Sequence, residues 1–174
     1  MTPSIRLLLQ ACMVGALLLL GGCSQSTTET NDATTLFTMT LTGAENGPHN
    51  FATNTMATLL TQDSTLIVVG SNTPFGSQIA KNNYALLEYR GAGVGTQPIS
   101  PNDTTLTPAN MMVVVDGTSY FAAEGSVSIT AYRSVGQLVE GTFSATLIGE
   151  NGGQLRVSNG RFAVKRVTDN SPYE

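Results

Sequence analysis

The sequence predicts an all-β protein, and three observations support that fold class. Apolar and polar residues alternate along several segments, the period of a strand with one buried face. Turn residues separate these segments about every 8–12 positions. Charged residues make up only 11% of the chain, and Thr, Ser and Asn supply its polarity, which is typical of strands faced with small hydroxylated side chains. We expect a single antiparallel β-sandwich, with a lipocalin-like barrel as the alternative.

The strands of the first half are predicted from alternation and from the turns between them. Residues 43–50 are expected to be a turn region, and residues 62–64 the turn of a hairpin. A short helix is an alternative for the segment that contains Ile79, Leu86 and Leu87. The predicted strands are Phe37–Leu41, Thr55–Leu60, Thr65–Val69 and Tyr84–Tyr89.

The second half contains the strongest hairpin signal, Asp116-Gly117 between two apolar runs. A two-residue Asp-Gly loop supplies the positive φ angles that a type I′ turn requires. The next strands are predicted at 111–115, 118–123, 126–131 and 139–147, and residues 150–153 then turn the chain. Phe143 and Leu147 are predicted to face inward. The last segment, Leu155–Val164, is either one strand with a bulge or two strands joined by a tight turn at Asn159-Gly160.

The longest stretch without strand periodicity runs from Gly91 to Asn110 and contains three glycines and three prolines. Its Gly91–Gly95 run lacks the G-x-G-x-x-G spacing of a phosphate-binding loop, so we interpret it as a connection. Loops of this length are commonly either functional or disordered, and the prolines argue against full disorder because they stiffen the segment. We therefore hypothesise that a ligand or partner contacts this loop through Asn102, Asp103 and Thr104 at its tip.

The first residues carry one positive charge, Arg6, followed by an apolar run from Leu7 to Leu20. This run is shorter than the roughly 20 residues that a membrane-spanning helix needs, and it has the length of a signal-peptide core. We predict that residues 1–22 are an export signal. Residues 24–34 hold one alanine and no other apolar side chain, so residues 23–34 are predicted to be a disordered tether and 169–174 a disordered tail, on either side of a domain at 35–168.

The tetrapeptide Leu20-Gly21-Gly22-Cys23 resembles the lipobox of bacterial lipoproteins. The resemblance implies cleavage between Gly22 and Cys23, a diacylglyceryl group on the Cys23 thiol, and a further acyl chain, such as palmitate, on the new amino group. Several acyl chains anchor a protein stably, whereas one chain holds it only marginally. Ser24 stands where lipoproteins retained at the inner membrane typically carry Asp. The resemblance therefore implies the outer membrane as the destination in a Gram-negative host.

The composition limits the partners and the redox chemistry. Removing residues 1–22 leaves 152 residues, enough for one domain, with seven basic and twelve acidic side chains. This negative balance argues against nucleic acid or anionic lipid as a partner, because both are bound through clustered Lys and Arg side chains. The two cysteines, Cys12 in the signal and Cys23 at the lipid site, leave the domain with no disulfide. We expect a monomer that needs no cofactor.

A search for catalytic or metal-binding patterns finds no recognisable site. His49 is the only histidine, and we interpret it as a surface turn residue. No G-x-S-x-G motif or metal-ligand spacing of Cys and His occurs, and Asp63, Asp103, Asp116 and Glu150 stand singly at predicted turns. A calcium site could be built from Asn102-Asp103 or from Glu150-Asn151, but neither pair lies in the residue pattern of an EF-hand loop. We expect no metal.

Three segments near the end of the chain resemble the closing strands of small β-rich bacterial lipoproteins of unknown function. These segments are Gly125–Thr130, Glu140–Ala145 and Ser158–Phe162. The resemblance supports the fold and implies no activity. We expect a non-enzymatic envelope lipoprotein that binds a small apolar ligand, a glycan or an envelope protein, or that has a structural role. The alternative is an envelope hydrolase with an unrecognised site.

Overall fold

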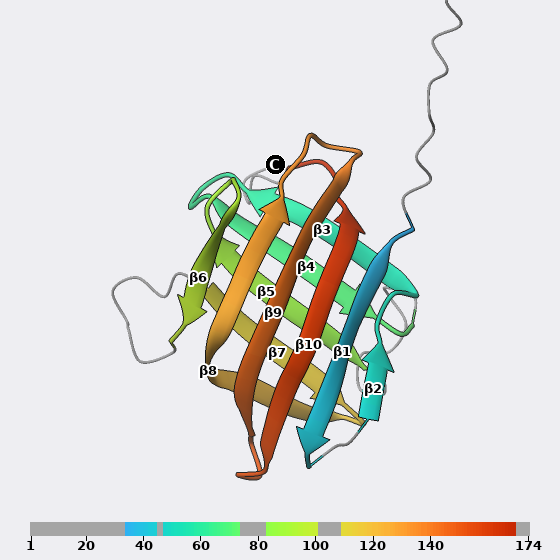
Figure 1. The fold of residues 1–174 in the computed structure, drawn as a ribbon, viewed down its shortest axis with the longest axis vertical. Helices are drawn as coiled ribbons and strands as arrows, with labels where there is room; N and C mark the ends of the chain where they lie inside the picture. Colours follow the sequence, from blue (N-terminus) through green and yellow to red (C-terminus); the bar gives the residue numbers. More distant parts are fainter. Residues whose placement is uncertain (1–33, 45–46, 74–82, 101–108, 170–174) are drawn as a thin grey trace, which may run out of the picture. The chain divides into compact units, whose positions relative to one another are not determined.

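Strands account for all the regular secondary structure in the described part of the chain, which confirms the all-β prediction (Figure 1). A computed structural model describes residues 34–44, 47–73, 83–100 and 109–169. The strands all lie in one compact unit, Ala33–Glu174, and the preceding unit, Met1–Asp32, falls outside the described residues. The ten strands are β1 (Leu36–Gly43), β2 (Gly47–Asn50), β3 (Asn54–Leu60), β4 (Thr65–Ser71), β5 (Tyr84–Arg90), β6 (Gly95–Ile99), β7 (Ala109–Val115), β8 (Thr118–Ala131), β9 (Leu138–Gly149) and β10 (Gln154–Lys165).

The strands form one continuous sheet in the order β2-β1-β10-β9-β8-β6-β7-β5-β4-β3, with a further pairing of β7 with β8. Neighbours run antiparallel except β6 and β7, which pair in parallel through Ile99 and Ala109. In Figure 1, β3, β4, β5 and β7 pass behind β8, β9, β10 and β1 and cross them steeply. The sheet therefore curls into a half-barrel whose two halves face each other across one core, an arrangement that shares features of both predicted architectures.

Strand β8 bends sharply and connects the two halves of the sheet. Its first residues, Thr118–Phe121, pair with β7, and Gly125–Ile129 pair with β6. A register shift between Ala122 and Glu124 marks the bend, where Gly125 has φ 150°. A side chain at Gly125 would collide with the backbone of β9, so glycine allows both the backbone angle and the close approach.

The segment that follows β10 reaches the opposite edge of the sheet. Arg166 forms a parallel bridge with Ala57 of β3. Val167 N donates a hydrogen bond to the Ala57 carbonyl (2.8 Å), and Thr58 Oγ1 donates one to the Thr168 carbonyl (3.1 Å). The first bond satisfies a backbone carbonyl at the outer edge of β3 that would otherwise be open to another strand, and the second adds a side-chain contact to the same segment.

Two reciprocal glycine–phenylalanine pairs lie in the core beneath β9 and β10. The tripeptides Gly141-Thr-Phe143 and Gly160-Arg-Phe162 lie antiparallel, so that Gly141 faces Phe162 and Gly160 faces Phe143. Each ring occupies the space above the opposite glycine, where a Cβ would collide with it. Phe37 joins both rings, with centroids 5.4 Å from Phe143 and 6.2 Å from Phe162. Phe143 is only 4% exposed, which confirms its predicted inward orientation.

The structure corrects one prediction in the first half of the chain. The region 43–50, predicted as a turn, contains the short strand β2, whose residues pair with β1. Its Gly-Pro-His-Asn sequence is typical of turns, but Pro48 is tolerated because β2 is an edge strand and one side of it needs no hydrogen-bond donor. The Tyr84–Tyr89 segment is a strand, as predicted, rather than a short helix.

In the second half, one prediction is wrong and one open alternative is decided. The predicted loop Gly91–Asn110 contains a strand, because Gly95–Ile99 pairs with β8 along its whole length, and its last two residues belong to β7. The pairing places Pro98 opposite Ser126, and the strand lacks period-two alternation, so the sequence favoured a loop. The segment Leu155–Val164 lies within one strand, and Asn159 (φ 53°) forms a bulge where the register shifts between Val157 and Gly160.

Candidate functional site

The site residues predicted from the sequence lie outside the described residues. This applies to Gly22 and Cys23 at the lipid site and to Asn102, Asp103 and Thr104 at the tip of the predicted binding loop. The described ends of that loop nevertheless lie close together. Ile99 of β6 pairs with Ala109 of β7, so the chain leaves and re-enters the described sheet at neighbouring positions.

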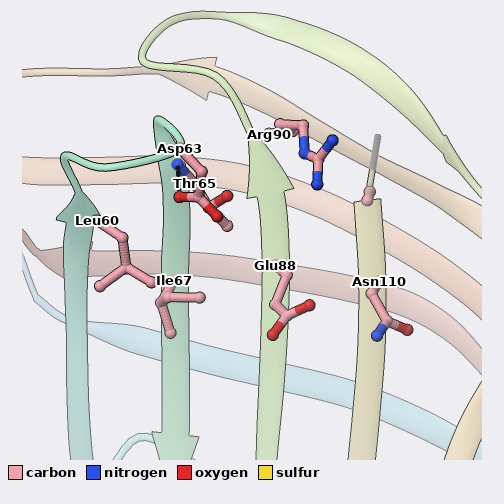
Figure 2. A pocket seen from close by; sticks show the side chains of 8 residues that line it. Leu60, Asp63, Thr65, Ile67, Glu88, Arg90 and Asn110 are labelled. Atoms are coloured by element: carbon pink, nitrogen blue, oxygen red, sulfur yellow. Dashed lines mark hydrogen bonds between the residues drawn. The ribbon is translucent and has the colours of Figure 1, made fainter. Parts of the chain in front are cut away.

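A polar hollow of about 130 Å³ lies beside these ends, on the outer face of β4, β5 and β7 (Figure 2). The strand register builds it: Thr65 pairs with Arg90, Ile67 with Glu88, and Glu88 with Asn110. Paired residues share a face of the sheet, so these side chains converge on one surface. The lining residues are Leu60, Asp63, Thr65, Ile67, Glu88, Arg90, Ala109 and Asn110.

Hydrogen bonds hold the backbone around the hollow, while two charged side chains at its surface, Glu88 and Arg90, can bind a partner. Asp63 accepts a hydrogen bond from Thr65 N (3.1 Å), which closes the β3–β4 turn. The Gln97 side chain holds both backbone groups of Arg90: its Oε1 accepts from Arg90 N at 3.1 Å, and its Nε2 donates to the Arg90 carbonyl. Among the described residues, neither the Glu88 carboxylate nor the Arg90 guanidinium has an ion-pair partner.

The size of this hollow limits what it can bind. Pockets that enclose small ligands have volumes of about 300–1,000 Å³, well above the value here. With a carboxylate, a guanidinium and an amide at its surface, the hollow can hydrogen-bond one polar group of a larger partner. It is too small to enclose a ligand by itself.

The larger candidate is a surface covered with small hydroxyl groups, which we call the hydroxyl face. It is the outer surface of β1, β10, β9, β8 and β6, and its Ser and Thr side chains point away from the core in register. One complete row across the five strands is Thr38, Arg161, Thr142, Ser128 and Thr96. The ten hydroxyl residues of the face are Thr38, Thr40, Thr42, Thr96, Ser126, Ser128, Thr142, Ser144, Thr146 and Ser158, and none of them is buried.

A broad open depression of about 510 Å³ lies on the hydroxyl face, next to the bulge of β8. Three serines, one from each of three adjacent strands, line it together with Thr146, Glu124 and Arg156. Thr146 Oγ1 donates a hydrogen bond to the Glu124 carboxylate (3.2 Å). The depression therefore presents hydroxyls, one carboxylate and one exposed guanidinium, a set that can both donate and accept hydrogen bonds.

His49 lies in strand β2 and not in the surface turn that the sequence suggested. Its ring is stacked on that of Phe51, with centroids 6.0 Å apart and planes inclined at 17°. It lines an open hollow with Thr38, Thr40 and Asn159. In the described ranges, no three His, Cys, Asp or Glu side chains are grouped closely enough to hold a metal ion, and no helix has the length and apolar character needed to cross a membrane.

No family model, curated protein or solved structure matches this chain. The assignment of the hydroxyl face as a candidate site therefore depends on the geometry of this chain alone. Its signal was present in the sequence as Thr and Ser alternating with apolar residues. What the sequence could not provide was the strand order, which brings hydroxyls from residue 38 to residue 158 onto one surface.

Proposed function

We propose that this chain is a lipid-anchored protein of the bacterial envelope whose β-domain binds a hydroxylated ligand, such as a glycan, without transforming it. The anchor is the lipid on Cys23, and the binding surface is the hydroxyl face. The observation that carries the proposal is the combination of the lipobox at residues 20–23 with an all-β domain that begins at Leu36.

The hydroxyl face supports a glycan as the ligand class. Neighbouring strands lie about 4.8 Å apart, and alternate residues of a strand about 6.7 Å apart, so the hydroxyls form a regular grid. Each hydroxyl both donates and accepts, which suits the repeated hydroxyls of a polymeric sugar. Short side chains also lose little conformational entropy when a ligand orders them. Arg156 and Arg161 add donors on the same surface.

The lipid anchor is tested by replacing Cys23 with Ser. The variant removes the thiol that would carry the diacylglyceryl group and changes nothing in the described domain. We expect it to lose radiolabelled fatty acid and to leave the membrane fraction. A Cys23→Ser protein that remained labelled and membrane-bound would refute the anchor.

Glycan binding is tested by titrating the protein with neutral and acidic oligosaccharides while following its amide NMR signals. We expect shifts concentrated on β8, β9 and β10. Ser144→Val should abolish them, because valine keeps the strand but removes the hydroxyl at the centre of the face. Ser119→Val is the matched control, since Ser119 lies on β8 outside the hydroxyl face. Shifts confined to the hollow of Figure 2 would relocate the site.

A further inference from the structure

The exposed large apolar side chains of the described domain gather at its two opposite ends. Val94, Val135 and Val167 are 67%, 49% and 37% exposed, and Phe121 and Ile148 are 47% and 41% exposed. Phe121 and Ile148 pair with each other across β8 and β9, at what we call the far end. The three valines belong to the β5–β6 turn, the β8–β9 turn and the segment after β10.

The three valines share the end of the domain at which the chain enters it, which we call the entry end. Leu36, the first residue of β1, pairs with Ala163, and Ala163 pairs with Glu140. The β8–β9 turn and the segment after β10 therefore lie beyond this row. Figure 1 shows the start of β1, the β8–β9 turn and the end of β10 together at the top of the sheet.

The β8–β9 turn is held rigidly by Arg166. The Arg166 Nη1 donates to the Arg133 carbonyl (2.9 Å), and its backbone exchanges hydrogen bonds with Gly136 and Gln137 (2.7 and 2.8 Å). The guanidinium is fixed by Asp169 (2.7 Å) and lies over the Tyr132 ring. Val135 is thus displayed on a preorganised turn, so burying it against a partner costs little ordering entropy.

A basic residue precedes two of these valines by two positions, Arg133 before Val135 and Lys165 before Val167. Lys165 is exposed, and Arg133 is 56% exposed while paired with Glu140 at 3.2 Å. At a lipid surface, apolar residues enter the interfacial layer, while the long Lys and Arg side chains extend to the phosphate groups. An apolar turn flanked by basic residues has the chemistry of such a contact.

We propose that the entry end rests on the surface of the lipid bilayer, with Val135 and Val167 in the interfacial layer and Val94 beside them. This inference builds on the lipid anchor proposed above. It orients the domain so that the far end, with Phe121 and Ile148, points away from the membrane. The hydroxyl face then stands upright and open to the space beyond the bilayer.

The length of chain between the lipid and the domain favours the entry end over the far end. Twelve residues separate Cys23 from Leu36 and span at most about 40 Å when fully extended. Ile148 lies eight residues along β9 from Glu140, about 26 Å from the entry row. Contact through the far end would require most of the available length to run beside the domain, whereas contact through the entry end requires none.

The experiment uses the absence of tryptophan from the sequence. The full-length Val135→Trp protein is extracted from membranes and reconstituted into phosphatidylcholine vesicles, some of which carry brominated acyl chains. We expect the Val135→Trp emission to shift to shorter wavelength and to be quenched by the brominated lipid. Ile148→Trp, a substitution of comparable exposure at the far end, is the matched control and should show neither effect.

The outcomes separate the inference from the anchor on which it builds. Protein that floats with the vesicles while Val135→Trp remains unquenched would overturn the orientation and leave the anchor standing. Quenching of Ile148→Trp instead would reverse the orientation. Protein that carries no lipid and does not float would overturn both proposals. Val94→Trp, on an independent turn, gives a second reading if Val135→Trp folds poorly, which circular dichroism reveals.

Discussion

The two outer surfaces of the curled sheet differ in chemistry. The hydroxyl face presents Ser and Thr on five strands, whereas the surface of β3, β4, β5 and β7 carries a row of larger apolar side chains. The strand register extends that row onto β8 and β9, through Met56, Val69, Leu86, Met112, Phe121 and Ile148. One continuous sheet thus has a hydroxylated outer surface on one half, and on the other an outer surface that combines an apolar row with the polar hollow of Figure 2.

This difference explains which orientations could be predicted from the sequence. Between residues 142 and 147 of β9, hydroxylated and apolar residues alternate strictly, so Phe143 and Leu147 were assigned correctly to the core. On β4 and β7, the apolar runs are continuous, and period-two alternation cannot separate an inward Val68 from an outward Val69. Alternation reveals orientation only where the outer surface is polar.

The largest effect is expected from a pair of phenylalanines on neighbouring strands. Phe143→Ala removes a ring packed between Phe37 and Phe162 and should lower the free energy of unfolding by about 3–5 kcal/mol. Phe121→Ala, at an exposed position, should cost less than about 1 kcal/mol. Chemical denaturation measures both. Equal losses would mean that the outer apolar row is packed like the core.

A smaller effect is expected from the reciprocal glycine–phenylalanine pairs. Gly141→Ala places a methyl group against the Phe162 ring and the Ser128 carbonyl, so we expect a loss of about 1–3 kcal/mol in unfolding free energy. Gly93→Ala is the control, because no atom lies within 4 Å of its Cβ position. A neutral Gly141→Ala would show that the rings can move away and that the close pairing is not required.

The sequence predicted the segments of eight of these strands, although it divided β8 into two, and it missed β2 and β6 for a physical reason. Both missed strands contain proline, and β2 is one of the two edge strands of the sheet. Proline and glycine favour turns in local sequence, but pairing with a long neighbour can override that preference. The hydroxyl face was foreseeable as polar strand surfaces, but its assembly depends on the non-local pairing of β1 with β10.

The stability of the protein should be more sensitive to a substitution on the apolar row than to one on the hydroxyl face. Met112→Thr on the apolar row should cost about 1 kcal/mol, because the partly buried methionine loses apolar contacts. Thr142→Val on the hydroxyl face should change the unfolding free energy by no more than about 0.5 kcal/mol. Thermal melts of both variants check this. A destabilising Thr142→Val would indicate that the hydroxyl contributes to folding and not to binding.

The smallest effect concerns alkaline pH. Burial raises the pKa of Tyr89 above its usual value of 10.0, and burial, opposed by Arg166 and reinforced by Asp169, also raises the pKa of Tyr132. The folded state therefore holds these protons more tightly than the unfolded chain. Their contribution to stability is complete below pH 10 and is lost as pH rises through the folded pKa values.

One conservative variant, Tyr132→Phe, tests whether Tyr132 contributes to this loss of stability at alkaline pH. The Tyr132 hydroxyl is buried without a hydrogen-bond partner among the described residues, so Tyr132→Phe should not destabilise the protein at neutral pH. It should also reduce the fall in melting temperature above pH 10. An unchanged alkaline profile would show that Tyr132 does not contribute to the titration.

The intact mass of the protein extracted from membranes tests the central claim most directly. The account predicts a chain that begins at Cys23 and carries a diacylglyceryl group together with an acyl chain on its amino group. A chain that begins at another residue, or one that begins at Cys23 without lipid, would contradict it.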